Sequence, residues 1–343
     1  MKALYTSLLV LLCWTGVQAQ EPQEHEYFPM LREDLVWVGN YYDGNWNDIY
    51  CIKVKGDTVV NGVTYKKCYR LRQDGYYWRY DPDFPYQNIN DSFRYFDPYV
   101  PASCMREENG KVYRLCEKGR EFIYCFRPES EFHNYTSEWL NETDTHYELL
   151  VYDFDNPNIY IFNSHETDLA SYGSVEAEGK QRRLYMNNSL GGHRVFIEGY
   201  GALGGGVHGS DMLEPCRTNW PTKDYFQFEP IYVRNDKGEV LYYEDFEDDD
   251  DWDEFYTDAN GNYYPLHYRD AYDFNDDGSF DVGDLNKTIN IMLGLAEDNI
   301  IARSPDLTFD QKVDIEDLNL IINRMLSDVE PIKYSDLRSR MQQ

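Results

Sequence analysis

A duplicated, carboxylate-rich segment near the C-terminus constrains the fold of this chain more than any other feature. Its first copy begins at Asp273 and its second at Asp306, 33 residues later, and each opens a twelve-residue stretch rich in aspartate. The same apolar pattern, Leu-Asn-x-x-Ile-Asn-x-Met-Leu, follows at 285–293 and again at 318–326. Apolar side chains at i, i+4 and i+7 form one stripe on a helix. We therefore expect two copies of one loop–helix unit, packed stripe to stripe.

The spacing of oxygen-bearing side chains in the first loop, residues 273–284, is that of a calcium site. Calcium takes six to eight oxygen ligands, which a twelve-residue loop supplies from positions 1, 3, 5, 7, 9 and 12, with glycine at position 6. Gly278 stands at position 6. We predict calcium binding here rather than a solvated turn rich in Asp and Asn. The predicted ligands are Asp273, Asn275, Asp277, Ser279 through its carbonyl, Asp281 and Asp284.

The second loop, residues 306–317, departs from this pattern. Thr308 replaces Asp or Asn at position 3, and Gln311 replaces glycine at position 6, where a left-handed backbone costs a non-glycine residue about 1–2 kcal/mol. Lys312 adds a positive charge to the loop. The sequence leaves open whether this loop binds calcium or only folds against the first. Its candidate ligands are Asp306, Thr308, Asp310, Asp314 and Asp317.

Through these loops and stripes, residues 268–334 resemble a type I dockerin, the module that attaches enzymes and binding proteins to cohesins. The resemblance implies a small all-α, EF-hand-like domain that binds calcium and a protein partner. Dockerins usually present a hydroxyl pair at loop positions 10 and 11. Val282 and Gly283 stand there in the first loop, and Ile315 and Glu316 in the second, which argues against an ordinary cellulosomal cohesin as the partner.

The N-terminus has the pattern of an export signal. Lys2 is followed by an apolar run at 8–12 and by Val17-Gln18-Ala19, which predicts a signal peptide over residues 1–19. Six cysteines remain beyond it, and an even number in an exported protein favours disulfides. The candidate pairs, taken from neighbouring strand-like runs, are Cys51 with Cys68 and Cys116 with Cys125.

A net charge of −30 argues against nucleic acid and anionic membrane surfaces as partners, because both require a basic face. No later stretch has the roughly 18 consecutive apolar residues of a membrane helix. We therefore expect no membrane span.

Between residues 28 and 243 the pattern is that of strands and turns. Asn61-Gly62, flanked by strand-like residues 58–60 and 63–65, is a signature of a two-residue hairpin turn. We predict a β-rich domain over 20–243, a sandwich or barrel, then an acidic linker over 244–267, the dockerin-like domain, and a tail over 335–343. Further predicted strands are 50–54, 111–115, 121–126, 149–153, 159–162, 194–198, 226–233 and 240–243.

Four short signatures in the β-rich part resemble a family of exported proteins from Gram-negative anaerobes. This family has no assigned activity, so the resemblance implies only an extracellular, cell-surface or periplasmic β module joined to a docking or sorting C-terminus. The signatures are Gly56-Asp-Thr-Val-Val-Asn-Gly-x-x-Tyr-Lys-Lys, Arg106-Glu-x-x-x-Lys-Val-Tyr, Glu148-Leu-Leu-x-Tyr-Asp-Phe and Ile197-Glu-Gly-Tyr-Gly.

No catalytic residues are predicted. The run Gly199-Tyr-Gly-Ala-Leu-Gly204 matches GxGxxG, but the glycines and proline after it forbid the helix that a dinucleotide site requires. The histidines form no zinc motif, and His208-Gly-Ser-Asp211 is better explained as a polar loop. Three functions remain open: a non-catalytic binding or display protein with a calcium-dependent docking module, a dockerin-bearing carbohydrate-active enzyme that binds glycans, and a β module whose C-terminal unit is purely structural.

Overall fold

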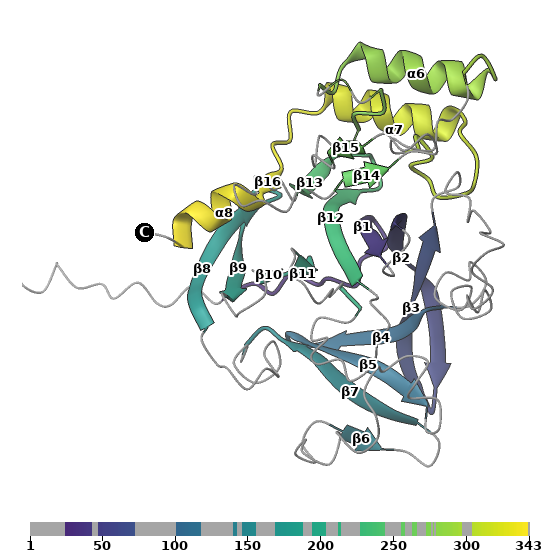
Figure 1. Cartoon of the computed structure of the whole chain (residues 1–343). Helices are drawn as coiled ribbons and strands as arrows, with labels where there is room; N and C mark the ends of the chain where they lie inside the picture. The colour runs from purple at the N-terminus through teal and green to yellow at the C-terminus, as the bar shows by residue number, and fades with distance from the viewer. Residues whose placement is uncertain are drawn as a thin grey trace, which may run out of the picture.

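In its described residues the protein is mainly β, with three sheets and three helices (Figure 1). The computed structural model describes residues 25–42, 47–72, 101–117, 140–142, 146–155, 169–187, 194–203, 212–213, 227–243, 255–257, 263–265, 272–275, 277, 279–296 and 304–341. The predicted mainly β fold is confirmed. The predicted signal peptide and the predicted strands 121–126 and 159–162 lie outside the described residues.

The largest sheet has ten strands. Neighbouring strands in it run antiparallel except for one parallel pair, β13 with β16. Its central strands carry apolar residues on both faces because each face is covered by another layer. In spatial order the strands are β16 (Ile332–Lys333), β13 (Val240–Tyr243), β12 (Gln227–Asn235), β1 (Leu35–Tyr42), β2 (Asn47–Val60), β3 (Val63–Arg72), β4 (Ser103–Glu108), β5 (Lys111–Glu117), β7 (His146–Asp153) and β6 (Leu140–Glu142).

A four-stranded sheet packs against one face of the large sheet and closes the first core. Leu35 and Trp37 of β1 and Ile52 of β2 lie in this core, together with Phe196 from the smaller sheet. Alternate residues of a strand point to one face, so these side chains share it. The order of the smaller sheet is β11 (Gly201–Leu203), β10 (Arg194–Ile197), β9 (Lys180–Asn187) and β8 (Leu169–Ala177).

The predicted hairpin at Asn61-Gly62 is confirmed. Strand β2 ends at Val60, strand β3 begins opposite it at Val63, and the two turn residues have φ of 51° and 81°. Positive φ at both central residues is what the tight hairpin turn requires, and Asn and Gly tolerate it best. Strands β5, β7, β10, β12 and β13 likewise overlap the runs predicted for them.

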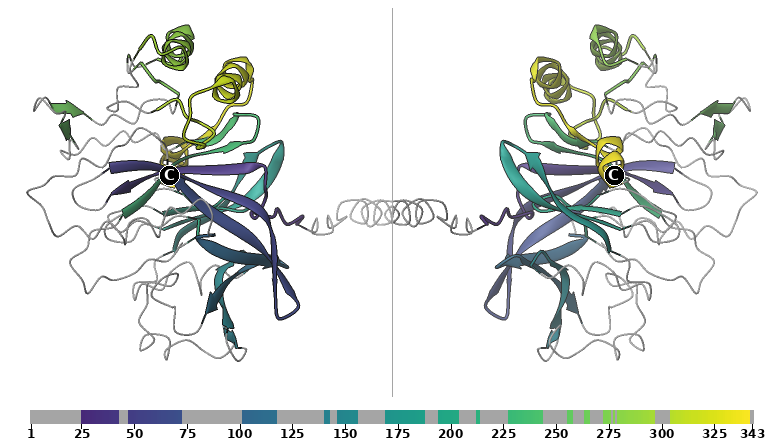
Figure 2. Two further views of the ribbon diagram at one scale, coloured as in Figure 1. Left: turned by 90° about the vertical axis from the view of Figure 1, so that its right-hand side faces the viewer. Right: turned by 90° about the vertical axis from the view of Figure 1, so that its left-hand side faces the viewer.

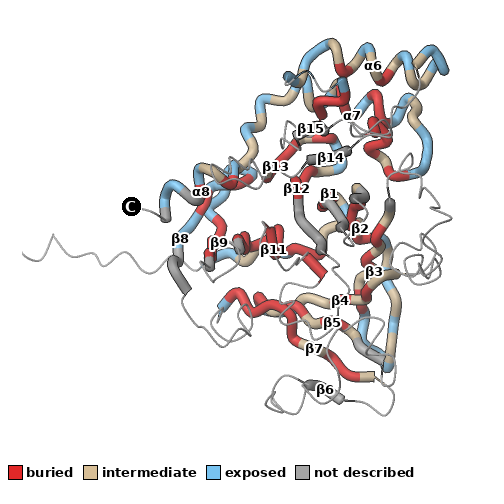
Figure 3. Tube along the Cα trace, viewed as in Figure 1, coloured by how far each residue is buried: buried red, intermediate tan, exposed pale blue. Residues whose placement is uncertain are grey.

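The opposite face of the large sheet is covered by helices α6 (Val282–Met292) and α7 (Ile315–Leu326) with their loops (Figures 1 and 2). A second core forms there. Val36 and Val38 of β1 meet Tyr272 and Phe274 of the first loop region and Ile321 of α7. In Figure 3, buried segments (red) lie both in the strands of the sheet and in the C-terminal unit. The C-terminal unit is therefore packed onto the sheet.

Beyond α7 the chain returns to the sheet. Strand β16 pairs with β13, and helix α8 (Tyr334–Met341) follows it over the region predicted to be a tail. Tyr334 and Leu337 are buried in the first core, each 1% exposed. Within the segment predicted as a linker, β14 (Phe255–Thr257) pairs with β15 (Tyr263–Pro265), and the rest of 244–267 lies outside the described residues.

The predicted pairing of Cys51 with Cys68 is corrected by the strand register. Cys51 lies opposite Leu71, whereas Cys68 lies opposite Val54, so the two cysteines point to opposite faces. Cys51 is a free thiol in the second core, and Cys68 is buried in the first. Of the other predicted pair, Cys116 lies on β5 and Cys125 falls outside the described residues.

None of the helices in the described part of the chain combines the length and apolar character needed to cross a membrane.

Candidate metal centre

The first loop is closed by the carboxylate of Asp284, which lies at position 12 and is fully buried. It accepts hydrogen bonds from the backbone N–H groups of Phe274 at 2.7 Å, Asn275 at 3.1 Å and Asp281 at 2.8 Å. Asp281 is also the N-cap of α6 and accepts from the Gly283 N–H at 2.6 Å. Capping residues therefore join the loop to its helix, as the sequence spacing requires.

The other predicted ligands of the first loop are joined to one another. Asp273 and Asn275 both accept from the backbone N–H of Asp277, at 3.1 Å and 3.0 Å. The carboxylate of Asp277 accepts from the side-chain amide of Asn275 at 2.8 Å and from the Ser279 N–H at 3.0 Å. All six predicted ligand residues thus lie in one hydrogen-bonded loop, while Gly278 is outside the described residues.

The second loop repeats part of this arrangement. Asp317 at position 12 is fully buried and accepts from the N–H groups of Thr308 at 2.8 Å and Asp314 at 2.9 Å. The Asp306 carboxylate accepts from the backbone N–H of Asp310 at 3.3 Å, and the Asp310 carboxylate accepts from the backbone N–H of Lys312 at 3.1 Å. The two loops therefore share these contacts as well as their spacing in the sequence.

Two residues of the second loop have a left-handed backbone, Phe309 with φ of 57° and Gln311, and the sequence predicts the second of them. Gln311, in the position that glycine takes in the first loop, has φ of 71°. Its N–H donates to Asp306 at 3.1 Å. A left-handed backbone at a residue with a side chain is tolerated only where the surroundings fix it. Gln311 is held by this contact to the first residue of its own loop.

Burial affects the acidity of one carboxylate of the second loop, that of Asp317. Removal of the Asp317 carboxyl from water raises its pKa above the ordinary value, since desolvation penalises the charged form more than its backbone hydrogen bonds favour it. In the described residues no three His, Cys, Asp or Glu side chains converge as a ready-made metal cluster. The loop aspartates instead accept backbone hydrogen bonds. The first loop nevertheless fits calcium by donor type, because every predicted ligand supplies oxygen.

Each helix buries only part of its predicted apolar stripe. Leu285, Ile289 and Met292 of α6 are half-buried, and so is Ile322 of α7, whereas Met325 is 39% exposed. The apolar side chain of α7 that is completely buried is Ile321, which lies in the core shared with the sheet. Packing of α7 onto the sheet, which the sequence did not indicate, explains why Ile321 rather than Ile322 is the buried residue. Apolar residues left exposed on the unit are Val282, Leu293, Leu295, Ile315, Met325 and Leu326.

Polar contacts also join the C-terminal unit to the sheet. The Tyr272 hydroxyl donates to the Gly238 carbonyl at 3.0 Å. Arg234 of β12 donates to the Leu307 carbonyl, and Lys53 of β2 donates to the Thr308 carbonyl. The last two contacts reach the backbone of the second loop. Sequence reasoning missed them because the partners are 73 and 255 residues apart.

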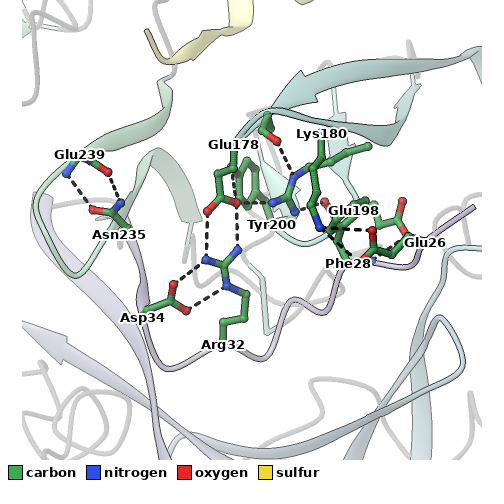
Figure 4. Close-up of polar contacts among 12 residues, drawn as sticks. Glu26, Phe28, Arg32, Asp34, Glu178, Lys180, Glu198, Tyr200, Asn235 and Glu239 are labelled. Carbon is green, nitrogen blue, oxygen red and sulfur yellow. Dashed lines mark hydrogen bonds and ion pairs between the residues drawn. The ribbon is translucent and has the colours of Figure 1, made fainter. Parts of the chain in front are cut away.

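A second polar cluster, which the sequence did not indicate, lies around Glu178, in the turn between β8 and β9 of the smaller sheet (Figure 4). The Arg182 guanidinium stacks between the rings of Phe28 and Tyr200, each centroid 4.7 Å away, and contacts Glu178. Glu178 also binds Arg32 at 2.9 Å. Cation–π and ion-pair contacts together compensate for the burial of this arginine.

Two carboxylates, the half-buried Glu107 and the fully buried Glu198, fix the segment 25–31 beside this cluster. Glu107 accepts from the backbone N–H groups of Met30 at 2.9 Å and Leu31 at 3.1 Å and from the Tyr27 hydroxyl. Burial raises the pKa of Glu107, and the nearby charge of Glu198 adds to the effect. Glu198 is fully buried and contacts His25 at 2.6 Å. These carboxylates anchor the chain, and we assign them a structural role.

The GxGxxG run forms no dinucleotide site. Gly201 begins strand β11 rather than a helix. Gly199 has φ of 86°, and a Cβ there would lie 2.0 Å from Arg182 Nη1, so glycine is required by a close approach. His208 and the residues after it up to 211 lie outside the described residues.

Comparison with known proteins found no match: no family model, no curated protein and no solved structure resembles this chain significantly.

Proposed function

We propose that this chain is an exported, non-catalytic protein in which a β-rich binding or display module carries a calcium-dependent, dockerin-like docking unit. The observation that carries the proposal is the matched closure of two twelve-residue loops on buried aspartates at position 12. That closure is what a calcium loop requires of its last ligand, and the first loop supplies oxygen at every other ligand position.

In the first loop, Asp273, Asn275, Asp277, Asp281 and Asp284 would hold the ion with the Ser279 carbonyl. Calcium, when bound, would neutralise this group of like charges and so stabilise the helix pair. The residues themselves fix the loop: Asp281 and Asp284 cap α6, and Tyr272 and Phe274 insert into the second core.

The docking surface would be the solvent-facing side of the helix pair. Val282 and Ile315 occupy equivalent positions, as do Leu293 and Leu326, and all four are at least 57% exposed. Exposed apolar side chains that gather in one small unit are typical of interaction surfaces. A protein that contacts these residues, cohesin-like or of another kind, is the partner that fits.

A purely structural C-terminal unit is the second candidate function. The second core, shared between the sheet and the helix pair, favours it. A carbohydrate-active enzyme has less support, since no pair of carboxylates among the described residues is singled out as an acid and a nucleophile.

Affinity capture tests the proposal. The full chain would be immobilised and exposed to the exported proteins of its producing cell with calcium chloride and then with chelator. We expect one partner that is released by chelator and is not captured by Leu293→Asp, while Val59→Asp, an equally exposed apolar site on β2, still captures it. A partner indifferent to both chelator and Leu293→Asp would contradict calcium-dependent docking.

A further inference from the structure

Two basic side chains of the large sheet lie directly beneath the second loop. Lys53 of β2 and Arg234 of β12 both pair with Val36 of β1, from opposite sides. Val36 faces the second core. Residues in register on adjacent strands point to the same face, so both cations point toward the C-terminal unit.

Both cations contact the backbone of the second loop. Arg234 is 2% exposed and donates to the carbonyl of Leu307, and Lys53 donates to the carbonyl of Thr308. The Lys53 ammonium also lies 5.9 Å from the centre of the Phe309 ring. Three consecutive residues of the loop are thus held by two cations of the sheet.

The same region contains a buried thiol and a loop aspartate. Cys51 is fully buried on the same face of β2 as Lys53. Burial raises the pKa of its thiol to about 12, and Lys53, Arg234 and Asp306 are all near enough for their charges to act on it. The first residue of the second loop therefore lies in a region that already contains two protein cations.

These features do not fit a second calcium ion. The loop contains Lys312, its glycine position holds Gln311 with φ of 71°, and Lys53 and Arg234 add positive charge from below. The four aspartates of the loop are thus already offset in part by three protein cations, which weakens their attraction for a calcium ion.

We propose that the second loop is a metal-free clasp whose partner is the chain's own sheet: Lys53 and Arg234 hold its backbone through Thr308 and Leu307. The chain then binds one calcium ion, at the first loop. Only this count of ions rests on the proposed function, because the clasp itself requires no metal.

The ion count is tested by calorimetric titration of the full chain with calcium chloride. One ion per chain is expected, with binding lost in Asp273→Ala and retained in Asp306→Ala. Two ions, one of which is lost in Asp306→Ala, would overturn the clasp and leave the proposed function intact. No binding to the wild-type chain would overturn the calcium site of the first loop, and the clasp would then be decided by its own experiment.

Cys51 supplies that experiment, because it is covered by the clasp. Alkylation of Cys51 by iodoacetamide, measured by peptide mass spectrometry in chelator, should be about tenfold faster in Lys53→Met and in Arg234→Met, since local opening exposes the thiol. Lys55→Met, on the same strand but exposed, is the matched control and should leave the rate unchanged. Lys53→Met keeps the apolar stem of a half-buried residue, so we expect the variant to fold. An unchanged rate in both variants would overturn the clasp.

Discussion

At the scale of single residues, one half-buried acid and one buried thiol show more about how this chain packs than its abundant surface carboxylates do. Glu107 and Cys51 both lie where two parts of the chain meet, and burial changes the acidity of each. The sequence indicates neither, because a residue's burial depends on strands and segments far along the chain.

The raised pKa of Glu107 predicts a pH dependence of stability. The folded state holds this proton at a pH where the unfolded chain has released it, so acidification should favour the folded state as the pH falls through the folded pKa. The gain is complete near pH 4.3, the ordinary value for Glu. Urea unfolding of the wild type and Glu107→Gln from pH 7 to about 4.5 checks this. The stability difference should shift toward the wild type on acidification, and a constant difference would contradict the assignment.

The first loop gives a second prediction at this scale. Asp284→Asn keeps one acceptor for the Phe274 N–H but removes the charge at position 12, and we expect calcium affinity to fall at least about tenfold. Asp328→Asn, an exposed acid beyond α7, is the control. Isothermal titration measures both. Equal affinities in the two variants would place the ion elsewhere.

At the scale of elements, local chemistry was predictable and long-range packing was not. The Asn61-Gly62 hairpin, the caps at Asp281 and Asp314 and the left-handed Gln311 all follow from residues within a few positions of one another. Strand β16 and helix α8 could not be predicted, because the short strand is fixed by β13, which lies about 90 residues earlier. The half-buried stripe of α7 has the same origin, since Ile321 is buried in the core that the C-terminal unit shares with the sheet.

Helix α8 is predicted to stabilise the first core. Leu337 is 1% exposed, so Leu337→Ala should lower the free energy of unfolding by about 2–4 kcal/mol. Asp336→Ala, on the exposed side of the same helix, should change it by less than about 0.5 kcal/mol. Chemical denaturation of the two variants makes the comparison. A loss below about 1 kcal/mol for Leu337→Ala would show that α8 is not part of the core.

At the scale of the whole molecule, the two cores lie on opposite faces of one sheet, and the chain passes from the second core back to the first through β16 and α8. The C-terminal unit resembles a separate domain in sequence, yet Tyr272, Phe274 and Ile321 are buried against the sheet. The sequence could not reveal this, because an apolar residue in a small repeat is equally compatible with a core inside the unit and with an interface. Calcium at the first loop should therefore act on the stability of the entire chain.

Differential scanning calorimetry of the full chain, with calcium and with chelator, tests this account most directly. We predict one cooperative transition in both conditions, raised by about 5 °C when calcium is near a hundredfold above its dissociation constant, since ligand binding at that excess contributes about 2.7 kcal/mol. Asp273→Ala should remove the shift. Two separate transitions, of which calcium moves only the smaller, would show that the unit folds independently of the sheet, and no shift at all would contradict calcium binding at the first loop.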